Sequence, residues 1–124
     1  MPFLYERDDV KRRVIVTWTG AFQAADVIDL LRRQREDGTW TYGLLLDTLV
    51  MTGHPNVGEL RQFVKLESET DSQQRARGPL AFVATDPKVY LAACTYAMLG
   101  PSTRKIEVFR NRDEADLWLT AETA

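Results

Sequence analysis

Polar side chains with the chemistry to bind or react gather in one short segment, residues 47–56. Its turn Gly53-His54-Pro55-Asn56 leads into a predicted helix, whose first backbone N–H groups have no partner within the helix and can donate to an anion. Hydroxyl and imidazole groups beside them could hold a small anion or a partner's carboxylate. The candidate binding residues of this segment are Asp47, Thr48, Thr52, His54 and Asn56.

The same segment also has a purely structural interpretation, which the residue types favour. Asn is a preferred helix N-cap, Pro55 would fix the turn, and His54 would then lie in solvent. Asp47 invites comparison with the phosphoacceptor aspartates of receiver domains, but the first long strand ends in the letters WTG and supplies no acidic partners for a metal. We therefore expect Asp47 to accept hydrogen bonds from loop amides.

Two more chain segments are expected at the same edge of the sheet. In open α/β sheets, ligands usually bind beyond the carboxyl ends of the strands. Thr85 and Asp86 follow one predicted strand, and Arg110-Asn111 follow another. Thr85 and Asp86 therefore complete the set of candidate ligand- or partner-binding residues, although Asp86 before Pro87 is also a typical helix start.

The sequence carries no set of residues that predicts catalysis. Cys94 and His54 could in principle form a nucleophile and base, yet Cys94 falls among apolar residues, where a cysteine is usually an inert small hydrophobe. One cysteine excludes an internal disulfide and a multi-cysteine metal site. No metal-ligand spacing, phosphate loop or Gly-x-Ser-x-Gly elbow is present. We expect no enzyme activity and no cofactor.

The elements that must position these residues alternate along the chain. An opening antiparallel hairpin is followed by strands and helices in turn, which predicts an α/β fold with a mostly parallel five-stranded sheet, one antiparallel edge strand and four helices. The expected strands are 3–6, 13–19, 42–46, 79–84 and 106–109. The expected helices are 23–36, 56–69, one from Asp86-Pro87 to Gly100, and one after Asn111.

Three local features look exposed by their composition. Residues 68–78 (SETDSQQRARG) are polar and predict a flexible loop. The basic clusters Lys11-Arg12-Arg13 and Arg32-Arg33-Arg35 could meet an acidic partner or lipid headgroups, but a solvated hairpin turn and a dipole-matched helix end explain them as well. Among the three tryptophans, Trp40 is the strongest candidate for an exposed aromatic side chain.

Composition places the chain among ordinary soluble domains. It has 124 residues, 44% hydrophobic and 27% charged, with a formal net charge of −2. That length predicts a single domain over residues 1–124, and that charge argues against a basic nucleic-acid binder. The longest aliphatic run, Leu44-Leu45-Leu46, is far too short for a membrane span. With no signal-peptide pattern in the first residues, we expect a cytoplasmic protein.

Several motifs together resemble a known family. In chain order they are VIVTWTG, LLLDT, LAFVATDP and the ending VFRNRDEADLWL, whose Phe109, Glu114-Ala115 and Trp118-Leu119 are the most specific part. They resemble the STAS domains of anti-sigma-factor antagonists and sulfate transporters, and more closely the SpoIIAA-like, STAS/SEC14-type group. The resemblance covers about residues 11 to 122 and implies a small regulatory or ligand-binding module.

One departure from that family bears on function. In the antagonist branch, a Ser or Thr at the start of the helix after the second core strand is phosphorylated. Aligning Asp47 and Gly58 with the family pattern puts Asn56 at that place, and Asn cannot be phosphorylated. The resemblance therefore implies the fold without the partner-switching mechanism.

Two functions remain for a chain of this kind. The first is a non-catalytic cytoplasmic STAS-like module that acts through protein contacts, either with a regulatory partner or by self-association as a homodimer. The alternative is a SEC14-like carrier of a small apolar ligand held between helices and sheet. Small residues on the third helix, Ala92, Ala93 and Ala97, could leave space for such a ligand.

Overall fold

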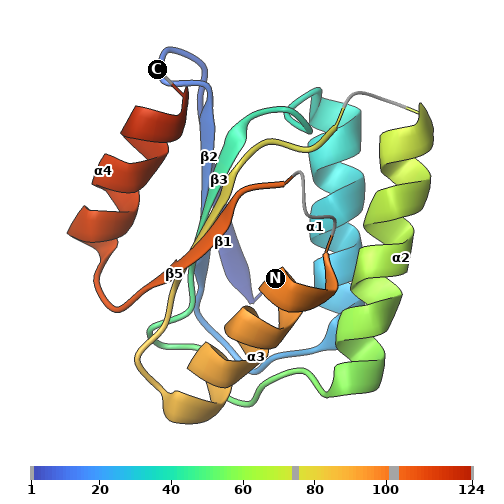
Figure 1. Cartoon of the computed structure of the whole chain (residues 1–124), viewed down its shortest axis with the longest axis vertical. Coiled ribbons are helices and arrows are strands. Elements are labelled where there is room, and N and C mark those ends of the chain that lie inside the picture. The colour runs from blue at the N-terminus through green and yellow to red at the C-terminus, as the bar shows by residue number, and fades with distance from the viewer. Residues whose placement is uncertain (1, 74–75, 101–103, 124) are drawn as a thin grey trace.

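The computed structural model describes residues 2–73, 76–100 and 104–123, which form one five-stranded sheet and four helices (Figure 1). The strands lie in the order β1-β2-β3-β4-β5; β1 is antiparallel to β2, and all other neighbours are parallel. The predicted α/β fold class is therefore confirmed. The elements are β1 (Phe3–Asp8), β2 (Arg13–Trp18), α1 (Ala24–Asp37), β3 (Gly43–Asp47), α2 (Val57–Gln73), β4 (Leu80–Val83), α3 (Pro87–Leu99), β5 (Ile106–Phe109) and α4 (Arg112–Thr123).

The central strands are apolar because both of their faces are covered. Helices α1, α2 and α3 lie on one face of the sheet and α4 lies alone on the other (Figure 1). In the parallel register, Val14 of β2 pairs with Leu44 of β3, and Leu44 pairs with Leu80 of β4. Successive side chains of a strand point to opposite faces, so each of the central strands β2, β3 and β4 contributes to two separate cores.

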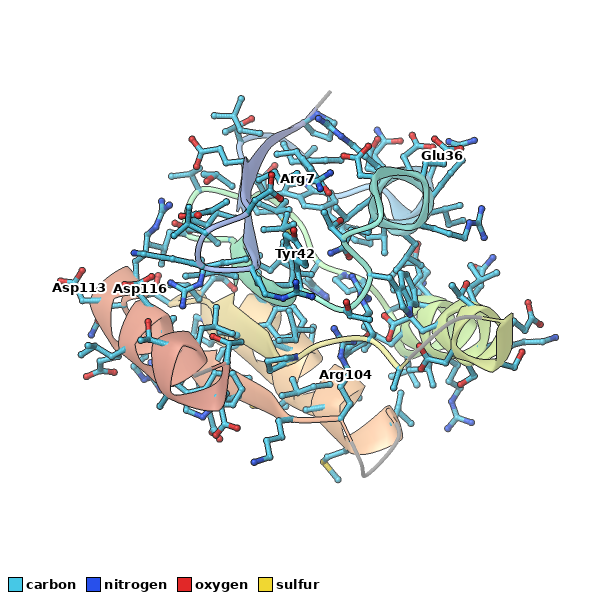
Figure 2. All side chains as sticks on the ribbon, turned by 90° about the horizontal axis from the view of Figure 1, so that it is seen from above. Arg7, Glu36, Tyr42, Arg104, Asp113 and Asp116 are labelled. Atoms are coloured by element: carbon cyan, nitrogen blue, oxygen red, sulfur yellow. The ribbon has the colours of Figure 1, made fainter. Side chains whose placement is uncertain are left out.

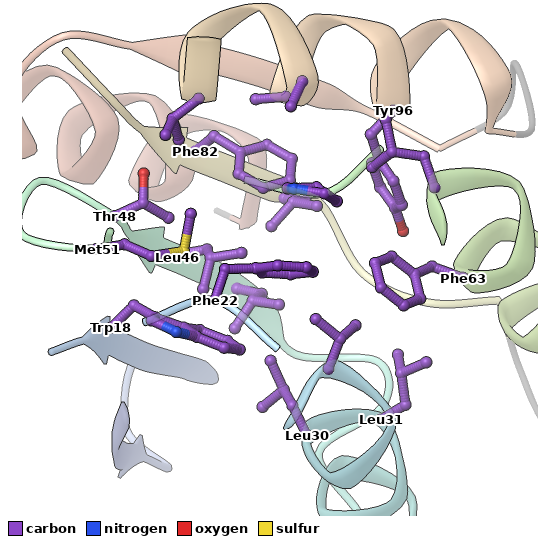
Figure 3. Close-up of a pocket in the computed structure, with 18 of the residues that line it drawn as sticks. Trp18, Phe22, Leu30, Leu31, Leu46, Thr48, Met51, Phe63, Phe82 and Tyr96 are labelled. Carbon is purple, nitrogen blue, oxygen red and sulfur yellow. The ribbon is translucent and has the colours of Figure 1, made fainter. Parts of the chain in front are cut away.

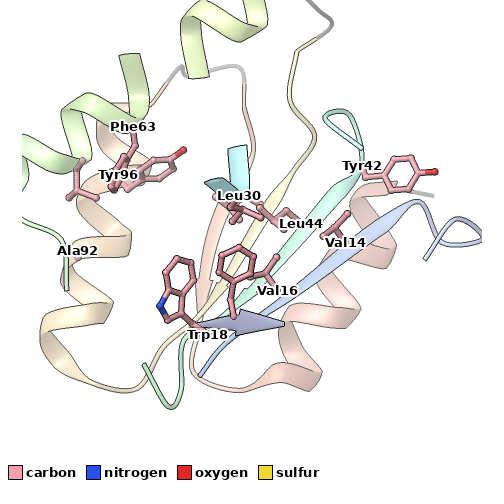
Figure 4. Close-up of a cluster of buried hydrophobic side chains, with 12 residues drawn as sticks. Val14, Val16, Trp18, Leu30, Tyr42, Leu44, Phe63, Ala92 and Tyr96 are labelled. Atoms are coloured by element: carbon pink, nitrogen blue, oxygen red, sulfur yellow. The ribbon is translucent and has the colours of Figure 1, made fainter. Parts of the chain in front are cut away.

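The larger core lies between the sheet and the three helices. Figure 4 shows its strand residues Val14, Val16 and Trp18 facing Leu30 of α1 and Phe63 of α2. The smaller core lies under α4 and consists of the buried residues Leu45, Ala81, Val83, Ala115 and Leu119. The three-helix face therefore holds most of the apolar side chains.

Helix α4 is held to the sheet by an ionic contact as well as by its core. The side chain of Arg13 on β2 is 2% exposed and donates to the Asp116 carboxylate and to Thr120 Oγ1, both on α4. Figure 2 shows Asp116 on α4, on the side that faces the sheet. The prediction that Arg13 belongs to a solvated hairpin turn was therefore wrong: this guanidinium reaches across the smaller core, where a carboxylate partner offsets part of the cost of burying its charge.

Two other expectations about exposure were also wrong. Helix α2 continues to Gln73, well into the segment predicted to be a flexible loop, and Arg77 at the end of that segment is buried. Trp40 is 2% exposed, and its indole N–H donates to Asp71 Oδ1 at 2.8 Å. Both errors have one cause: polar and aromatic groups here find partners far away in the chain, which composition does not reveal.

Truncating Leu119 should test the smaller core. Leu119 is fully buried, so Leu119→Ala should lower the free energy of unfolding by about 2–5 kcal/mol, through lost burial and the cavity left behind. Leu117→Ala is the matched control on the same helix, because Leu117 is 70% exposed and its loss should change stability by about 0.5 kcal/mol or less. Urea denaturation measures both. Equal losses in the two variants would contradict the burial of this face of α4.

Candidate functional site

Two buried polar residues lie at the carboxyl end of β3: Asp47, its last residue, and Thr48, which follows it. Asp47 Oδ1 accepts a hydrogen bond from the backbone N–H of Leu49 at 3.0 Å, and its Oδ2 lies 3.6 Å from Arg112 Nη1. Thr48 Oγ1 donates to the carbonyl of Val83 at 2.7 Å. These bonds join the carboxyl ends of β3 and β4, so both side chains have structural partners.

Thr52 and His54 lie farther along this segment and are exposed. The Thr52 carbonyl accepts from the backbone N–H of Phe22 at 2.8 Å, which attaches the segment to the chain just before α1. His54 Nδ1 lies 3.1 Å from the carbonyl oxygen of Pro55. The imidazole therefore has a neighbouring backbone partner and stands in solvent.

Asn56 and Asp86 are helix caps. Asn56 Oδ1 accepts from the N–H of Glu59 at 2.8 Å, and Glu59 Oε1 accepts in return from the N–H of Asn56 at 3.0 Å, which is a complete capping box at the start of α2. Asp86 Oδ1 accepts from the N–H groups of Lys88 and Val89 at the start of α3. Thr85 beside it is exposed.

All seven candidate residues lie at the carboxyl edge of the sheet, yet they do not form one cluster. Among the residues that the structure describes, no hydrogen bond joins any two of them. Within that same part of the chain, no three His, Cys, Asp or Glu side chains gather closely enough to hold a metal ion.

A cavity of about 90 Å³ lies between the sheet and the three helices, and Figure 3 shows the residues around it. Its wall is almost entirely apolar, with side chains from β2, β3, β4, α1, α2 and α3. The segment 47–56 contributes Thr48, Met51 and Pro55 to the wall. Part of the predicted site therefore belongs to the cavity wall.

Small residues of α3 help to leave this space. Ala92 and Ala93 line the cavity, where longer side chains would fill it. Trp18, Phe22 and Phe63 form an aromatic row along the wall, with neighbouring ring centroids 6.3 Å apart in both pairs. The rigid rings of these three residues and the short side chains of α3 together preserve the volume.

One part of the cavity wall is charged. Glu67 of α2, Arg77 before β4 and Tyr96 of α3 line the cavity and contact one another. Glu67 Oε1 accepts from Arg77 Nη1 at 2.7 Å and also from the Tyr96 hydroxyl, while Glu67 Oε2 accepts from Arg104 Nη1 at 2.9 Å. We call Glu67, Arg77, Tyr96 and Arg104 the charged cluster.

The charged cluster is buried. The side chains of Arg77 and Arg104 are each 4% exposed, and that of Glu67 is 6% exposed. Burial, and then repulsion from Arg104, lowers the pKa of Arg77 to about 10. Burial likewise lowers the pKa of Arg104, although Glu67 opposes the shift. Both guanidiniums rely on Glu67 as their directly bonded carboxylate.

A close backbone approach places Arg77 in the cluster. Its neighbour Gly78 packs so tightly that a Cβ there would lie 2.3 Å from the carbonyl oxygen of Tyr42. The Gly78 N–H donates to the Trp40 carbonyl, and the Gly78 carbonyl accepts from Arg104 Nε at 3.0 Å. A side chain at position 78 would push this strand entry, and Arg77 with it, away from the sheet.

Comparison with known proteins places this architecture. No family model matches the sequence, and no curated protein matches it significantly. The fold does match the crystal structure of an uncharacterised protein of the DUF3478 family, with a SpoIIAA-like fold, from Shewanella loihica PV-4. The match covers 94% of this chain and 91% of that one, with a TM-score of 0.62 and 14% sequence identity. This protein has a SpoIIAA-like fold.

The likeness confirms the SpoIIAA-like resemblance noted in the sequence, and at this identity it speaks for the fold alone. Over the SpoIIAA-like chain's described residues, no helix combines the length and apolar character that crossing a membrane requires.

The charged cluster of this SpoIIAA-like chain was missed at the sequence level, although one signal was present. Leu60, Phe63 and Glu67 are spaced as i, i+3 and i+7, so helical periodicity alone places Glu67 on the apolar face of α2. A carboxylate at such a position needs a cationic partner. Nothing local identifies Arg77 and Arg104 as those partners, because they lie 10 and 37 residues away.

Replacing Glu67 should test the charged cluster. Glu67→Gln keeps the size of the side chain but leaves two buried guanidiniums without their carboxylate, so the free energy of unfolding should fall by about 3–5 kcal/mol. Glu69→Gln is the matched control, since Glu69 is exposed on the same helix and its change should be small. Urea denaturation at pH 7 measures both. A Glu67→Gln variant as stable as the control would mean that the pairing is not as described.

Proposed function

We propose that this SpoIIAA-like chain is a non-catalytic binding module that holds a small apolar ligand between its helices and its sheet. The cavity of about 90 Å³ carries the proposal. Protein interiors are normally packed without such spaces, so the apolar wall of this cavity lacks contacts that a bound apolar group would supply. A fold that keeps this volume with Ala92 and Ala93 in its wall gains from filling it.

The arrangement at the carboxyl edge supports a module without catalysis. Four candidate residues there form structural hydrogen bonds with loop amides, with a strand carbonyl or as helix caps. They are Asp47, Thr48, Asn56 and Asp86. The family resemblance aligns Asn56 with the position at which STAS antagonists carry a phosphorylated hydroxyl, and the Asn56 side chain instead caps α2. Phosphorylation at that place is therefore not part of the proposed function.

The volume sets the size of the ligand. An apolar cavity of ~150 Å³ accepts benzene, with six carbons, so 90 Å³ corresponds to roughly four carbons. Burying four such groups contributes about 3 kcal/mol, which corresponds to a Kd of about 5 mM. A four-carbon alcohol, 1-butanol, is therefore a suitable uncharged probe.

Filling the cavity from α3 should prevent binding. Wild-type protein titrated with 1-butanol should show saturable amide shifts in ¹H–¹⁵N spectra at residues around the cavity. Ala93→Leu adds three carbons to the wall and should weaken this binding at least about tenfold, since ~2 kcal/mol of apolar contact is lost. Ala97→Leu is the matched control, because Ala97 lies on the same helix and is not part of the wall.

Two results would contradict the proposal. The first is a wild-type protein whose spectra do not change with 1-butanol. The second is unchanged binding by a folded Ala93→Leu variant, which would place the ligand elsewhere.

A second candidate function is self-association or contact with a regulatory protein through segment 47–56. The observation that favours it is exposed apolar surface: Leu49, Val50 and Val57 are 42%, 60% and 52% exposed. A formal net charge of only −2 sets little repulsion against pairing of two copies. A homodimer joined through these side chains is the simplest form of this candidate.

A charge at Val50 should disrupt such a homodimer. Light scattering after size exclusion should show a dimer for the wild-type protein and a monomer for Val50→Asp, because the new carboxylate would be buried against apolar surface. Val10→Asp is the matched control at a site that is 96% exposed in the β1–β2 turn, and it should remain dimeric. A wild-type monomer at all concentrations would rule out self-association.

A further inference from the structure

The charged cluster has more hydrogen-bond donors than acceptors. Arg77 donates through Nη1 to Glu67 and through Nη2 to Gln34 Oε1, and Arg104 donates to Glu67, to Tyr96 and to the carbonyl of Gly78. Arg77 Nε, Arg104 Nη2 and Gln34 Nε2 are buried and have no acceptor among the residues that the structure describes. Three buried donors in one connected group are a strong departure from the usual pairing of polar groups.

Asp71, another carboxylate near the charged cluster, already accepts hydrogen bonds from other groups. Asp71 Oδ1 accepts from the indole N–H of Trp40 at 2.8 Å and from the backbone N–H of Arg77 at 3.2 Å. Its charge favours both guanidiniums at a distance, but it makes no hydrogen bond to either among the described side chains. Glu67 alone therefore bonds directly to two buried cations.

Arg77 connects this excess of hydrogen-bond donors with the cavity. It is the one member of the cluster that both lines the cavity and has a buried donor without an acceptor among the described residues. The remainder of the wall is apolar apart from Glu67, Thr48, the Tyr96 hydroxyl and the indole N–H of Trp18. In the view of Figure 3, Tyr96 and Phe63 mark one side of the cavity, and Thr48 and Met51 mark the other.

We propose that the cavity binds a small amphipathic carboxylate, whose head accepts from the unpaired donor of Arg77 and whose short aliphatic tail fills the apolar volume beside Ala92 and Ala93. This proposal rests on the proposed function, because it names the chemistry of the ligand held in that cavity. A carboxylate supplies acceptors in the geometry that a guanidinium fork recognises. Glu67 alone bonds directly to both guanidiniums among the described residues. The negative charge of the ligand would balance the second of these two positive charges.

The few unpaired donors in the cavity lining favour a carboxylate head over a phosphate. A phosphate carries a greater charge and three acceptor oxygens, whereas among the described residues Arg77 is the one member of the cluster that combines a place in the cavity lining with an unpaired donor. The indole N–H of Trp18, also buried and without an acceptor there, is uncharged and can hold a hydroxyl equally well. Preference for an acid over the alcohol of equal length is therefore the signature of Arg77.

The test compares four probes with four carbons each on the wild-type protein: butanoate, 1-butanol, butylammonium and butyl phosphate. Butanoate should bind at least about tenfold more tightly than 1-butanol, as expected for a hydrogen bond to a charged group. The arginine Nε–H signals in ¹H–¹⁵N spectra provide a direct readout. The signal of Arg77, assigned by its absence in Arg77→Lys, should move with butanoate and stay in place with 1-butanol.

A matched pair of variants then assigns the head group. Arg77→Gln should lose the preference for butanoate over 1-butanol, while Arg61→Gln, changed at an exposed site of α2, should keep it. If Arg77→Gln does not fold, the probe comparison and the Nε–H readout on the wild-type protein decide alone.

The outcomes separate this proposal from the proposed function. Equal binding of butanoate and 1-butanol would overturn the acid-headed ligand and leave the apolar carrier standing. Tightest binding of butylammonium or of butyl phosphate would overturn the carboxylate in favour of that head group. If none of the four binds, both the carrier function and this proposal are wrong.

Discussion

The carboxylate of Glu67 is the interaction on which the arrangement of the helices depends. It accepts hydrogen bonds from Arg77, Arg104 and Tyr96, and so connects α2 with the entry to β4, the entry to β5 and α3. Through Arg77 the connection extends to Gln34 of α1. Separating a buried cation from its carboxylate is costly, so these five segments must hold fixed positions relative to one another.

This connection explains why space can persist between sheet and helices. A purely apolar interface would let α2 and α3 move inward until their side chains filled the gap, because each buried methylene group gained is favourable. At the charged cluster such movement would break hydrogen bonds to buried charges. Elsewhere along the wall the row Trp18, Phe22 and Phe63 resists it with rigid rings. The cavity is the volume that these two constraints leave between them.

Local signals were enough to predict the architecture and the place of the candidate residues. Alternating apolar strands and helices determine a mostly parallel sheet, and Asp47, Asn56 and Asp86 fall at its carboxyl edge because each follows a strand or begins a helix. The cap at Asp86 could be read directly from its position before Pro87. These features depend on neighbours in the chain, which periodicity and residue type describe well.

The charged cluster could not be predicted in the same way, because its contacts are distant in sequence. Residues 68–78 have the composition of a loop, yet Asp71 partners Trp40, and Arg77 is placed by the fit of Gly78 against Tyr42. Ala92 and Ala93 did suggest unfilled space, but only the packing of α3 against the sheet shows that they face a cavity. The sequence therefore does not reveal which residue pairs with each buried charge.

The two candidate functions share one segment and so are not independent. Met51 and Pro55 line the cavity, while Leu49 and Val50 of the same segment present apolar surface to solvent. Thr48 is anchored to β4 and Thr52 to the chain before α1, so the intervening residues are held at both ends. A ligand that displaces Met51 must therefore shift the residues beside it. Linkage then requires reciprocity: a partner bound at Val50 changes the affinity of the cavity by the same factor with which the ligand changes the affinity for the partner.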